Sequence, residues 1–282
     1  MNHYLITIAY DGSRYYGWQR LKNQPKTIQG ILENSLSNYM SEKIHIHGSG
    51  RTDAGVSAIA QTADFLCSYN IENEADDSDT SETSEMSFLN AVNKTLPGDI
   101  QITSIRLLDN SIPAQKHFNA RKSAVEKHYR YTISLSSKTN PFNHKHIYNM
   151  IDAPINLNYK RDFDYAYIDD DNMKQCVSYL CGVHDFSAFT TDKNPEKSHI
   201  RTLNKIEISY IYSIYPALQF DFYGEGFLYN MVRILSGTLL LAGLGKIKAA
   251  QIPDIIASKK RKYAGPTLPS NGLTLVSVKY DL

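Results

Sequence analysis

One short segment of the sequence brings a carboxylate, a cation and several glycines together. It reads Gly48-Ser49-Gly50-Arg51-Thr52-Asp53-Ala54-Gly55. Glycines this dense let a backbone bend sharply or approach another group closely. Such a loop can present Asp53 in a tight site beside Arg51, where a carboxylate acts as a nucleophile or stabilises positive charge on a substrate. The spacing fits neither a Walker phosphate loop nor a dinucleotide fingerprint, so an ordinary turn is an equal alternative at this point.

Composition indicates an ordinary globular protein in a reducing compartment. The chain has 282 residues, of which 42% are apolar and 21% charged, enough for two domains and unlike a disordered or fibrous protein. Its three cysteines are too few and too irregularly spaced for a disulfide framework or a zinc site, which favours the cytoplasm. The N-terminus lacks the pattern of a signal peptide, and no apolar run is long enough to span a membrane.

Charge is distributed unevenly along the chain. The net charge of +1 by itself argues against a nucleic-acid partner, but residues 52–93 contain neither Lys nor Arg. This region holds an acidic cluster of Glu72, Glu74, Asp76, Asp77, Asp79, Glu82 and Glu85. Without these seven acids, 22 acidic side chains face 30 basic ones, a net charge of +8. The remainder is basic enough for a phosphate-binding surface, and we expect residues 68–86 to be a solvated loop that points away from it.

Apolar periodicity predicts an α+β protein with two domains, 1–112 and 113–282. In the first, strands are predicted over 3–10, 43–48, 61–66 and 100–107, with helices over 88–96 and after an N-cap at Thr27. In the second, strands are predicted over 123–135, 201–210, 217–223 and 274–280, and helices over 169–180, 226–244 and 247–258. Residues 109–120 are predicted to be a connector and 138–164 to be irregular.

Further motifs accompany the glycine-rich loop in a consistent order. They are Tyr10-Asp11-Gly12, Tyr16-Gly17-Trp18-Gln19, Thr27-Ile28-Gln29-Gly30, Phe118-Asn119-Ala120-Arg121, His128-Tyr129-Arg130-Tyr131 and Gly226-Phe227-Leu228-Tyr229-Asn230-Met231-Val232-Arg233. Together with the loop they resemble the tRNA pseudouridine synthase TruA family, nearly from end to end. The chain departs from that resemblance at Ser57 and Asn119, where many family members carry His. These departures and the acidic cluster suggest a paralogue with a different target site.

The resemblance implies a fold, a reaction and partners. The fold would be two α+β domains that share an extended, mostly antiparallel sheet, with helices on one face and a basic cleft between the domains. The reaction would isomerise specific uridines to pseudouridine in tRNA, in the anticodon stem-loop. The resemblance also implies a homodimer.

The resemblance assigns roles to individual residues. Asp53 matches the catalytic aspartate, and Arg51 matches an arginine that contacts the flipped nucleotide. Tyr129 matches the tyrosine that packs on the target base, and Arg233 matches the arginine that pairs with the catalytic carboxylate. Further substrate contacts are expected from Phe118, Asn119, Ala120, Arg121 and Arg201.

The chemistry suits these residue types. Isomerisation breaks the N1–C1′ bond, rotates the base, joins C5 to C1′ and removes the C5 proton, so it requires neither a cofactor nor a metal. An ionised carboxylate near C1′ can add covalently or stabilise positive charge on the sugar, and a paired arginine keeps its pKa low. The base must leave its stack, and the aromatic face of Tyr129 can hold it.

Other interpretations remain open on the sequence alone. The same reaction on ribosomal RNA, or a non-catalytic RNA-binding role on this scaffold, are the main alternatives. A glycosidase would normally need a second acid, and none stands out near Asp53. The basic run Lys259–Lys262 is more typical of a solvated face than of an RNA contact. Gly182–Phe186 is more typical of a structural turn than of a His–Asp relay.

Overall fold

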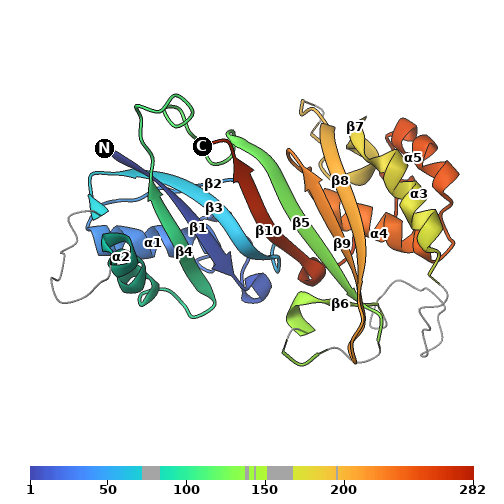
Figure 1. Ribbon diagram of the computed structural model, residues 1–282, viewed down its shortest axis with the longest axis horizontal. Coiled ribbons are helices and arrows are strands. Elements are labelled where there is room, and N and C mark those ends of the chain that lie inside the picture. The colour runs from blue at the N-terminus through green and yellow to red at the C-terminus, as the bar shows by residue number, and fades with distance from the viewer. Residues whose placement is uncertain (72–82, 137–139, 143, 151–167, 195) are drawn as a thin grey trace. The chain divides into compact units, whose positions relative to one another are not determined.

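Two compact units make up the described part of the chain. The computed structural model describes all residues except 72–82, 137–139, 143, 151–167 and 195 (Figure 1). Unit 1 contains Met1–Val125 and Leu275–Leu282, and unit 2 contains Glu126–Thr274. The domain boundary after residue 112, expected from the sequence, stays a prediction.

Unit 1 combines an antiparallel sheet with two helices. In chain order its elements are β1 (Asn2–Tyr10), α1 (Ile28–Met40), β2 (His47–Gly48), β3 (Ser57–Cys67), α2 (Ser84–Asn93), β4 (Ile100–Leu107) and most of β10 (Leu273–Tyr280). The strand order is β4-β1-β3-β10, with β2 paired to β3. Both neighbours of β1 run antiparallel to it.

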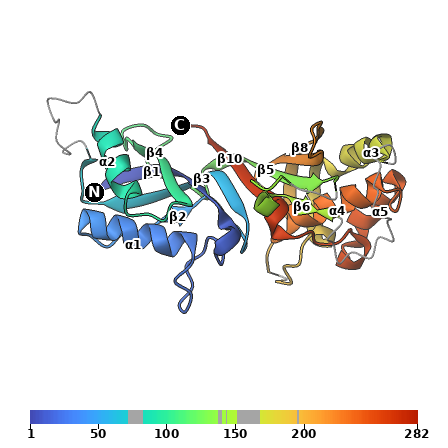
Figure 2. The ribbon, with the colours of Figure 1, turned by 90° about the horizontal axis from the view of Figure 1, so that it is seen from below.

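The strands of unit 1 bury side chains on both faces. Tyr4, Ile6, Ile8 and Tyr10 alternate along β1 and are all buried, as expected for a face that packs on a core. Helix α1 runs along one face of the strands (Figure 2) and buries residues one turn apart: Ile28, Leu32 and Leu36. A smaller cluster contains Leu108, Phe118 and Ala120, with Leu5 and Tyr280 packed against it.

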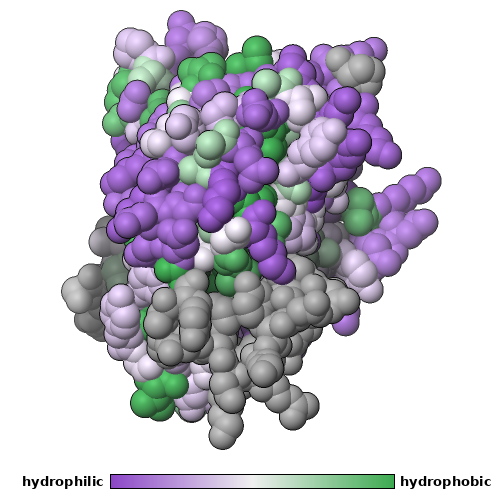
Figure 3. Space-filling model, turned by 90° about the vertical axis from the view of Figure 1, so that its right-hand side faces the viewer, coloured by the Kyte–Doolittle hydropathy of each residue, from purple (hydrophilic) through white to green (hydrophobic). Residues whose placement is uncertain are grey.

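Unit 2 repeats the α+β style. Its elements are β5 (Ala124–Ser134), β6 (Tyr148–Asn149), α3 (Asp170–Leu180), β7 (Gly182–Asp185), β8 (Ile200–Ile211), β9 (Ala217–Gly224), α4 (Met231–Gly243) and α5 (Ile252–Ser258). The strand order is β5-β9-β8-β7, antiparallel throughout, with β6 added parallel to β5. The end of the unit with α3 and α5 is mainly hydrophilic where it is described (Figure 3). The predicted α+β class is therefore confirmed.

Most predicted elements are present, and several have different ends. Helix α4 begins five residues later than predicted because Asn230 has a left-handed backbone, φ 61°, that a helix cannot continue through. Helix α2 begins at Ser84 rather than 88, behind Thr83, whose hydroxyl accepts the Met86 N–H. Strand β7 was not predicted. Much of the predicted acidic loop, residues 72–82, lies outside the described residues.

The predicted strand over 43–48 is wrong except for its last two residues. Ile44 and Ile46 are buried, which produced the alternating pattern. Their N–H groups, however, donate to the side chains of Ser37 and Glu33 on α1, at 2.9 and 3.1 Å. Those groups are therefore unavailable to a neighbouring strand. The alternation of apolar residues over 43–48 therefore reflects burial against helix α1 and not strand pairing.

Thr27 stands at the predicted N-cap of α1 but makes no capping hydrogen bond. Its hydroxyl is buried without a partner among the described residues. A Cβ on Gly30 would come within 2.9 Å of that oxygen, so the glycine leaves space for it.

The described residues contain neither a helix that could span a membrane nor a cluster that could hold a metal ion. None of the described helices is long and apolar enough to cross a membrane. In the same part of the chain, no group of three or more His, Cys, Asp or Glu side chains is placed to hold a metal ion.

A buried asparagine ties the helices of unit 2 together, and its removal should destabilise the protein. Asn172 donates to the carbonyls of Ala242 and Ile247, both at 2.8 Å, and accepts the Ala249 N–H at 2.9 Å. Asn172→Ala removes three buried hydrogen bonds and should cost about 3 kcal/mol in the free energy of unfolding. Urea denaturation measures this.

The matched control for that substitution is Asn204→Ala. Asn204 is exposed, and its side chain donates to Glu126 at 3.0 Å. We expect a change within about 0.5 kcal/mol. Equal losses for the two variants would contradict the role given to Asn172.

Candidate active site

The Asp53 loop closes in a tight turn that requires a glycine. The Val56 N–H donates to the Asp53 carbonyl at 3.1 Å, and Gly55 between them has φ +82°. Positive φ at the third residue is the signature of a type II turn, which favours glycine. The loop therefore forms a defined turn with Asp53 as its first residue.

Segment 12–18 presses directly on this loop. Gly17 has φ +87°, and a Cβ on it would lie 2.6 Å from the Thr52 carbonyl oxygen and 3.0 Å from the Asp53 carbonyl carbon. The Trp18 N–H donates to that same Thr52 oxygen at 3.0 Å. Only glycine at position 17 permits this approach, so the local backbone sets the place of Asp53.

Trp18 fixes the start of the loop in the same way. Its indole is 2% exposed. A Cβ on Gly48 would come within 2.6 Å of the ring atoms Cε2 and Nε1. Glycine at position 48 therefore lets the chain cross the face of the tryptophan.

A network of buried polar side chains supports the loop through hydrogen bonds. The Tyr10 hydroxyl lies 2.7 Å from Thr52 Oγ1, and burial raises the pKa of Tyr10 well above its usual value. Ser49 Oγ donates to Gln61 Oε1 at 2.6 Å, and Gln61 Nε2 donates to the Gly50 carbonyl at 3.0 Å. Ser49, Gln61, Thr52 and Tyr10 are all nearly inaccessible, at 6% exposure or less. Satisfied buried networks of this kind make a loop rigid.

The two charged side chains of the loop differ in environment. Asp53 is half-buried, and Arg51 is exposed. Arg51 makes no hydrogen bond or ion pair within the described part of the chain. Its guanidinium is therefore available to an anionic ligand.

Tyr129 lies on β5 in unit 2. It is 8% exposed, and its ring meets that of Phe227 edge to face, with centroids 5.2 Å apart. Its cross-strand partner is Phe222. The aromatic surroundings hold the Tyr129 ring in one orientation.

An ionic cluster flanks Tyr129 along the same strand. Asp221 on β9 accepts from Arg130 Nε at 2.8 Å and lies 2.5 Å from His128 Nε2. Burial alone would raise the pKa of Asp221, but the hydrogen bonds from His128 and Arg130 outweigh burial and lower that pKa. The His128 ring also stacks on Tyr223, with centroids 4.2 Å apart. The residues on either side of Tyr129 are therefore fixed to β9.

Arg233 occupies the first turn of α4. Its Nε donates to the Leu268 carbonyl at 2.6 Å, and its Nη1 donates to Asn230 Oδ1 at 2.7 Å. A cation in a first helical turn opposes the helix dipole. The position therefore works against helix stability, which favours a functional reason for the charge.

The predicted substrate-binding residues fall into two groups. Phe118 and Ala120 are buried, with 5% and 0% exposure, so their side chains lie away from solvent. Asn119 is half-buried and Arg121 exposed. Arg201 donates to the carbonyls of Ser198 and Ile200 at 3.0 and 2.6 Å, and burial lowers its pKa.

Three weaker candidates receive structural explanations. Asp185 pairs with Lys259 at 2.7 Å and accepts from Ser187. Burial opposes ionisation, but these partners bring the pKa of Asp185 down to about 2. His184 instead bonds the Cys181 carbonyl, at 3.0 Å, so the pair forms no relay. Ser57, a departure from the family pattern, is buried and accepts the Gly12 N–H at 3.0 Å.

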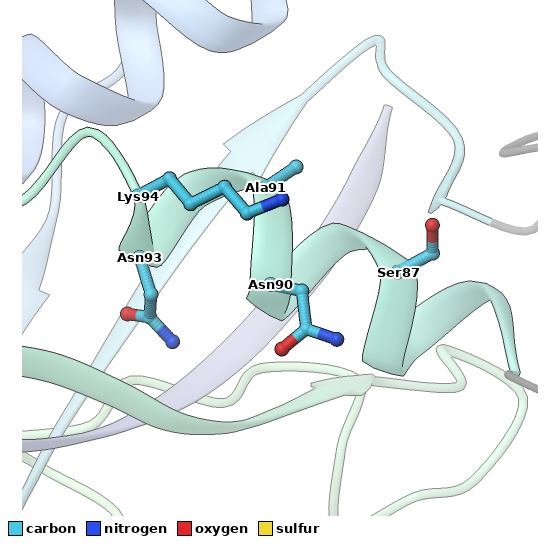
Figure 4. Close-up of a pocket in the computed structure, with 5 residues that line it drawn as sticks. All are labelled: Ser87, Asn90, Ala91, Asn93 and Lys94. Atoms are coloured by element: carbon cyan, nitrogen blue, oxygen red, sulfur yellow. The ribbon is translucent and has the colours of Figure 1, made fainter.

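A surface hollow on α2 is less suited to be the active site than the region of these residues. It measures about 600 Å³ and is lined by Ser87, Asn90, Ala91, Asn93 and Lys94 (Figure 4). The Asn93 amide is engaged with the Ile102 backbone at 2.9 and 2.8 Å. The lining offers no acid and none of the predicted site residues.

Sequence reasoning missed the supporting residues. In the sequence, Tyr10 stands out only as part of a motif, and Gln61 only as the start of a predicted strand. Asp221 carried a signal, a charge within an alternating strand, but its partners depend on strand register. Register is set by tertiary pairing and is not readable from one strand.

Comparison with known proteins agrees with the resemblance seen in the sequence. Residues 6–106 and 176–281 match the family described as tRNA pseudouridine synthase. The Asp53 loop and Arg233 fall within the matched residues, and Tyr129 and Phe118–Arg121 fall between the two ranges.

Relatives cover the whole chain. A tRNA pseudouridine synthase A of Caldicellulosiruptor bescii is 37% identical over 283 residues, 99% of this chain and 100% of the relative. One of Acetivibrio thermocellus is 36% identical over 280 residues, with the same coverage of both chains. A tRNA pseudouridine synthase A 2 of Bacillus cereus is 35% identical over 281 residues, again with this coverage.

The contact at Gly17 should be intolerant of a methyl group. Gly17→Ala places a Cβ against the Thr52 carbonyl and imposes an unfavourable positive φ, so unfolding free energy should fall by about 2 kcal/mol or more. Gly98→Ala is the control, since no described atom lies within 4 Å of its added Cβ. Urea denaturation of both variants tests this, and a neutral Gly17→Ala would refute the steric argument.

The Asp221 cluster should make stability depend on pH. The pKa of Asp221 is lowered in the folded protein. Its contribution to stability is therefore complete above the usual carboxyl pKa of about 3.9 and is lost as the pH falls further. Asp221→Asn should cost about 2 kcal/mol near pH 7, and the deficit should shrink below about pH 4. Denaturation midpoints from acid to neutral pH measure it; a deficit independent of pH would show that packing, not charge, is lost.

Proposed function

Because the chain belongs to the tRNA pseudouridine synthase family, we propose that it isomerises uridine to pseudouridine in tRNA, with Asp53 as the catalytic carboxylate. The rigid, glycine-built turn that presents Asp53 is the observation that carries this assignment. A turn supported by Gly17, Trp18 and the Tyr10 network keeps one carboxylate at a set place, as catalysis requires.

The reaction is balanced within the nucleotide. The N1–C1′ bond breaks, the base rotates, C5 bonds to C1′, the C5 proton leaves and N1 gains a proton. Asp53 adds to C1′ or stabilises the positive charge on the sugar while the base is detached. No electrons or groups leave the substrate, so the chain's own side chains are sufficient for the chemistry.

The other proposed catalytic groups have complementary roles. Arg51 is exposed and unpaired in the described residues, which suits contact with the RNA backbone at the extruded nucleotide. Tyr129, held edge-on by Phe227, offers a ring face for stacking on the base. Arg233, a cation opposed to its own helix dipole, is proposed to keep the catalytic carboxylate ionised.

The finer proposals concern target and assembly. The family resemblance supports a uridine of the anticodon stem-loop as the target, a homodimer as the assembly and the cytoplasm as the location. Substrate contacts are assigned to the segment Phe118–Arg121 and to Arg201. Within that segment the buried Phe118 and Ala120 side chains act by placing their exposed neighbours.

Asp53→Asn tests the assignment. The change removes a charge and little shape, so turnover should fall by at least about a thousandfold while the Kd for RNA stays within about tenfold. Pseudouridine is mapped at single-nucleotide resolution in unmodified tRNA transcripts incubated with the full chain. Asp281→Asn, at an exposed position, is the matched control and should retain full activity.

Each outcome has a definite meaning. Product in the anticodon stem-loop that disappears with Asp53→Asn supports both reaction and target. Product in ribosomal RNA but in no tRNA would replace the substrate. Binding without product on either RNA would contradict the catalytic role, and loss of binding with Asp53→Asn would make Asp53 a structural residue.

A further inference from the structure

A short turn in unit 1 exposes three cations. Lys116, Arg121 and Lys122 are all exposed, and none forms an ion pair within the described residues. No acidic residue occurs between Asp109 and Glu126. We refer to residues 116–122 as the cationic turn. Its charge suits a polyanion such as RNA.

Hydrogen bonds within the cationic turn hold its backbone, and Asn119 accepts most of them. Asn119 Oδ1 accepts the N–H groups of Arg121 and Lys122, at 3.2 and 3.1 Å. The Asn119 carbonyl accepts from Lys122 and Ser123, at 3.0 and 2.9 Å. These bonds hold the backbone from which the Arg121 and Lys122 side chains project.

A buried carboxylate anchors the turn to the sheet. Asp64 on β3 is 4% exposed, and its Oδ1 accepts the Ala120 N–H at 2.7 Å. Its Oδ2 lies 2.9 Å from Nε2 of His3 on β1. The Tyr280 hydroxyl donates to the Ala120 carbonyl at 2.7 Å, so both backbone groups of Ala120 are held.

Packing reinforces the anchor. Phe118 is 5% exposed, and its ring meets Tyr280 at 5.0 Å and His3 at 6.1 Å between centroids. The inward side chains Phe118 and Ala120 therefore lie between the exposed cations Lys116 and Arg121 along the chain. Burying a carboxylate is costly unless it is hydrogen-bonded, and Asp64 has partners in His3 and in the Ala120 N–H of the cationic turn.

We propose that Asp64 is a positioning residue for RNA binding, which acts by holding Ala120 so that Lys116, Arg121 and Lys122 meet phosphate groups of the RNA. This inference rests on the proposed function, since it takes RNA as the substrate. It adds a residue that touches no RNA itself and a set of cations that act as one surface.

A double-mutant cycle tests the proposal with the full chain. Asp64→Ala should raise the Kd for an unmodified tRNA transcript about tenfold and lower the salt dependence, measured between about 50 and 200 mM salt, by about two phosphate contacts. In a protein that carries Lys116→Gln, Arg121→Gln and Lys122→Gln, the same Asp64→Ala should change the Kd less than about twofold. Equal effects in both backgrounds would overturn the proposal.

Controls separate positioning from general stability. Val92→Ala, at a buried position of α2 outside the turn, should lower the melting temperature without changing the Kd. In turnover assays Asp64→Ala should raise KM while kcat stays within about twofold, whereas global destabilisation would not change KM selectively. If Asp64→Ala does not fold, Tyr280→Phe removes the other bond to Ala120 and should show the same coupling.

The binding experiment tests the Asp64 role separately from the proposed reaction. Kd values do not depend on turnover, so coupling without any pseudouridine would contradict the proposed reaction and support the Asp64 role. Pseudouridine formation together with an additive cycle would support the proposed reaction and contradict the Asp64 role.

Discussion

The close passage of the Gly17 backbone over Thr52 and Asp53 is the contact on which the Asp53 turn depends. It brings a segment from the end of β1 and a loop before β3 within van der Waals distance, with no side chain between them. Gly17 and Gly48 permit the approach, and the Trp18 ring fills the adjacent space. The loop therefore derives its shape from a second segment of chain, and its own sequence supplies mainly the freedom to adopt that shape.

Buried polar groups hold each piece of this arrangement. Tyr10, Ser49 and Gln61 would each be costly to bury alone, and hydrogen bonds among them and to the loop offset that cost. Such a network is specific because its bonds are directional. It stabilises one loop conformation, which a purely apolar contact would not select so narrowly.

Buried carboxylates have the same use in both units. In unit 1, Asp64 joins two strands to the cationic turn, and in unit 2, Asp221 joins β9 to the residues on either side of Tyr129. Each is buried and each is satisfied by more than one donor. The charged residues assigned to chemistry are arranged differently: Arg51 is exposed, and Arg233 opposes its helix dipole. The groups that stabilise the two units are thus different residues from Arg51 and Arg233, which are proposed to act in the chemistry.

The sequence by itself determined the α+β class, most elements and the Asp53 motif, because apolar periodicity and glycine spacing are local properties. The tertiary structure alone decided that 43–48 is mostly no strand, that α4 starts at Met231, and that β10 returns to the sheet of unit 1. It also decided the partners of Asp64, Tyr10 and Asp221, which lie 56, 42 and 93 residues away along the chain. Those partners depend on strand register and on which segments cross, and such long-range pairings leave no periodic trace in a single sequence.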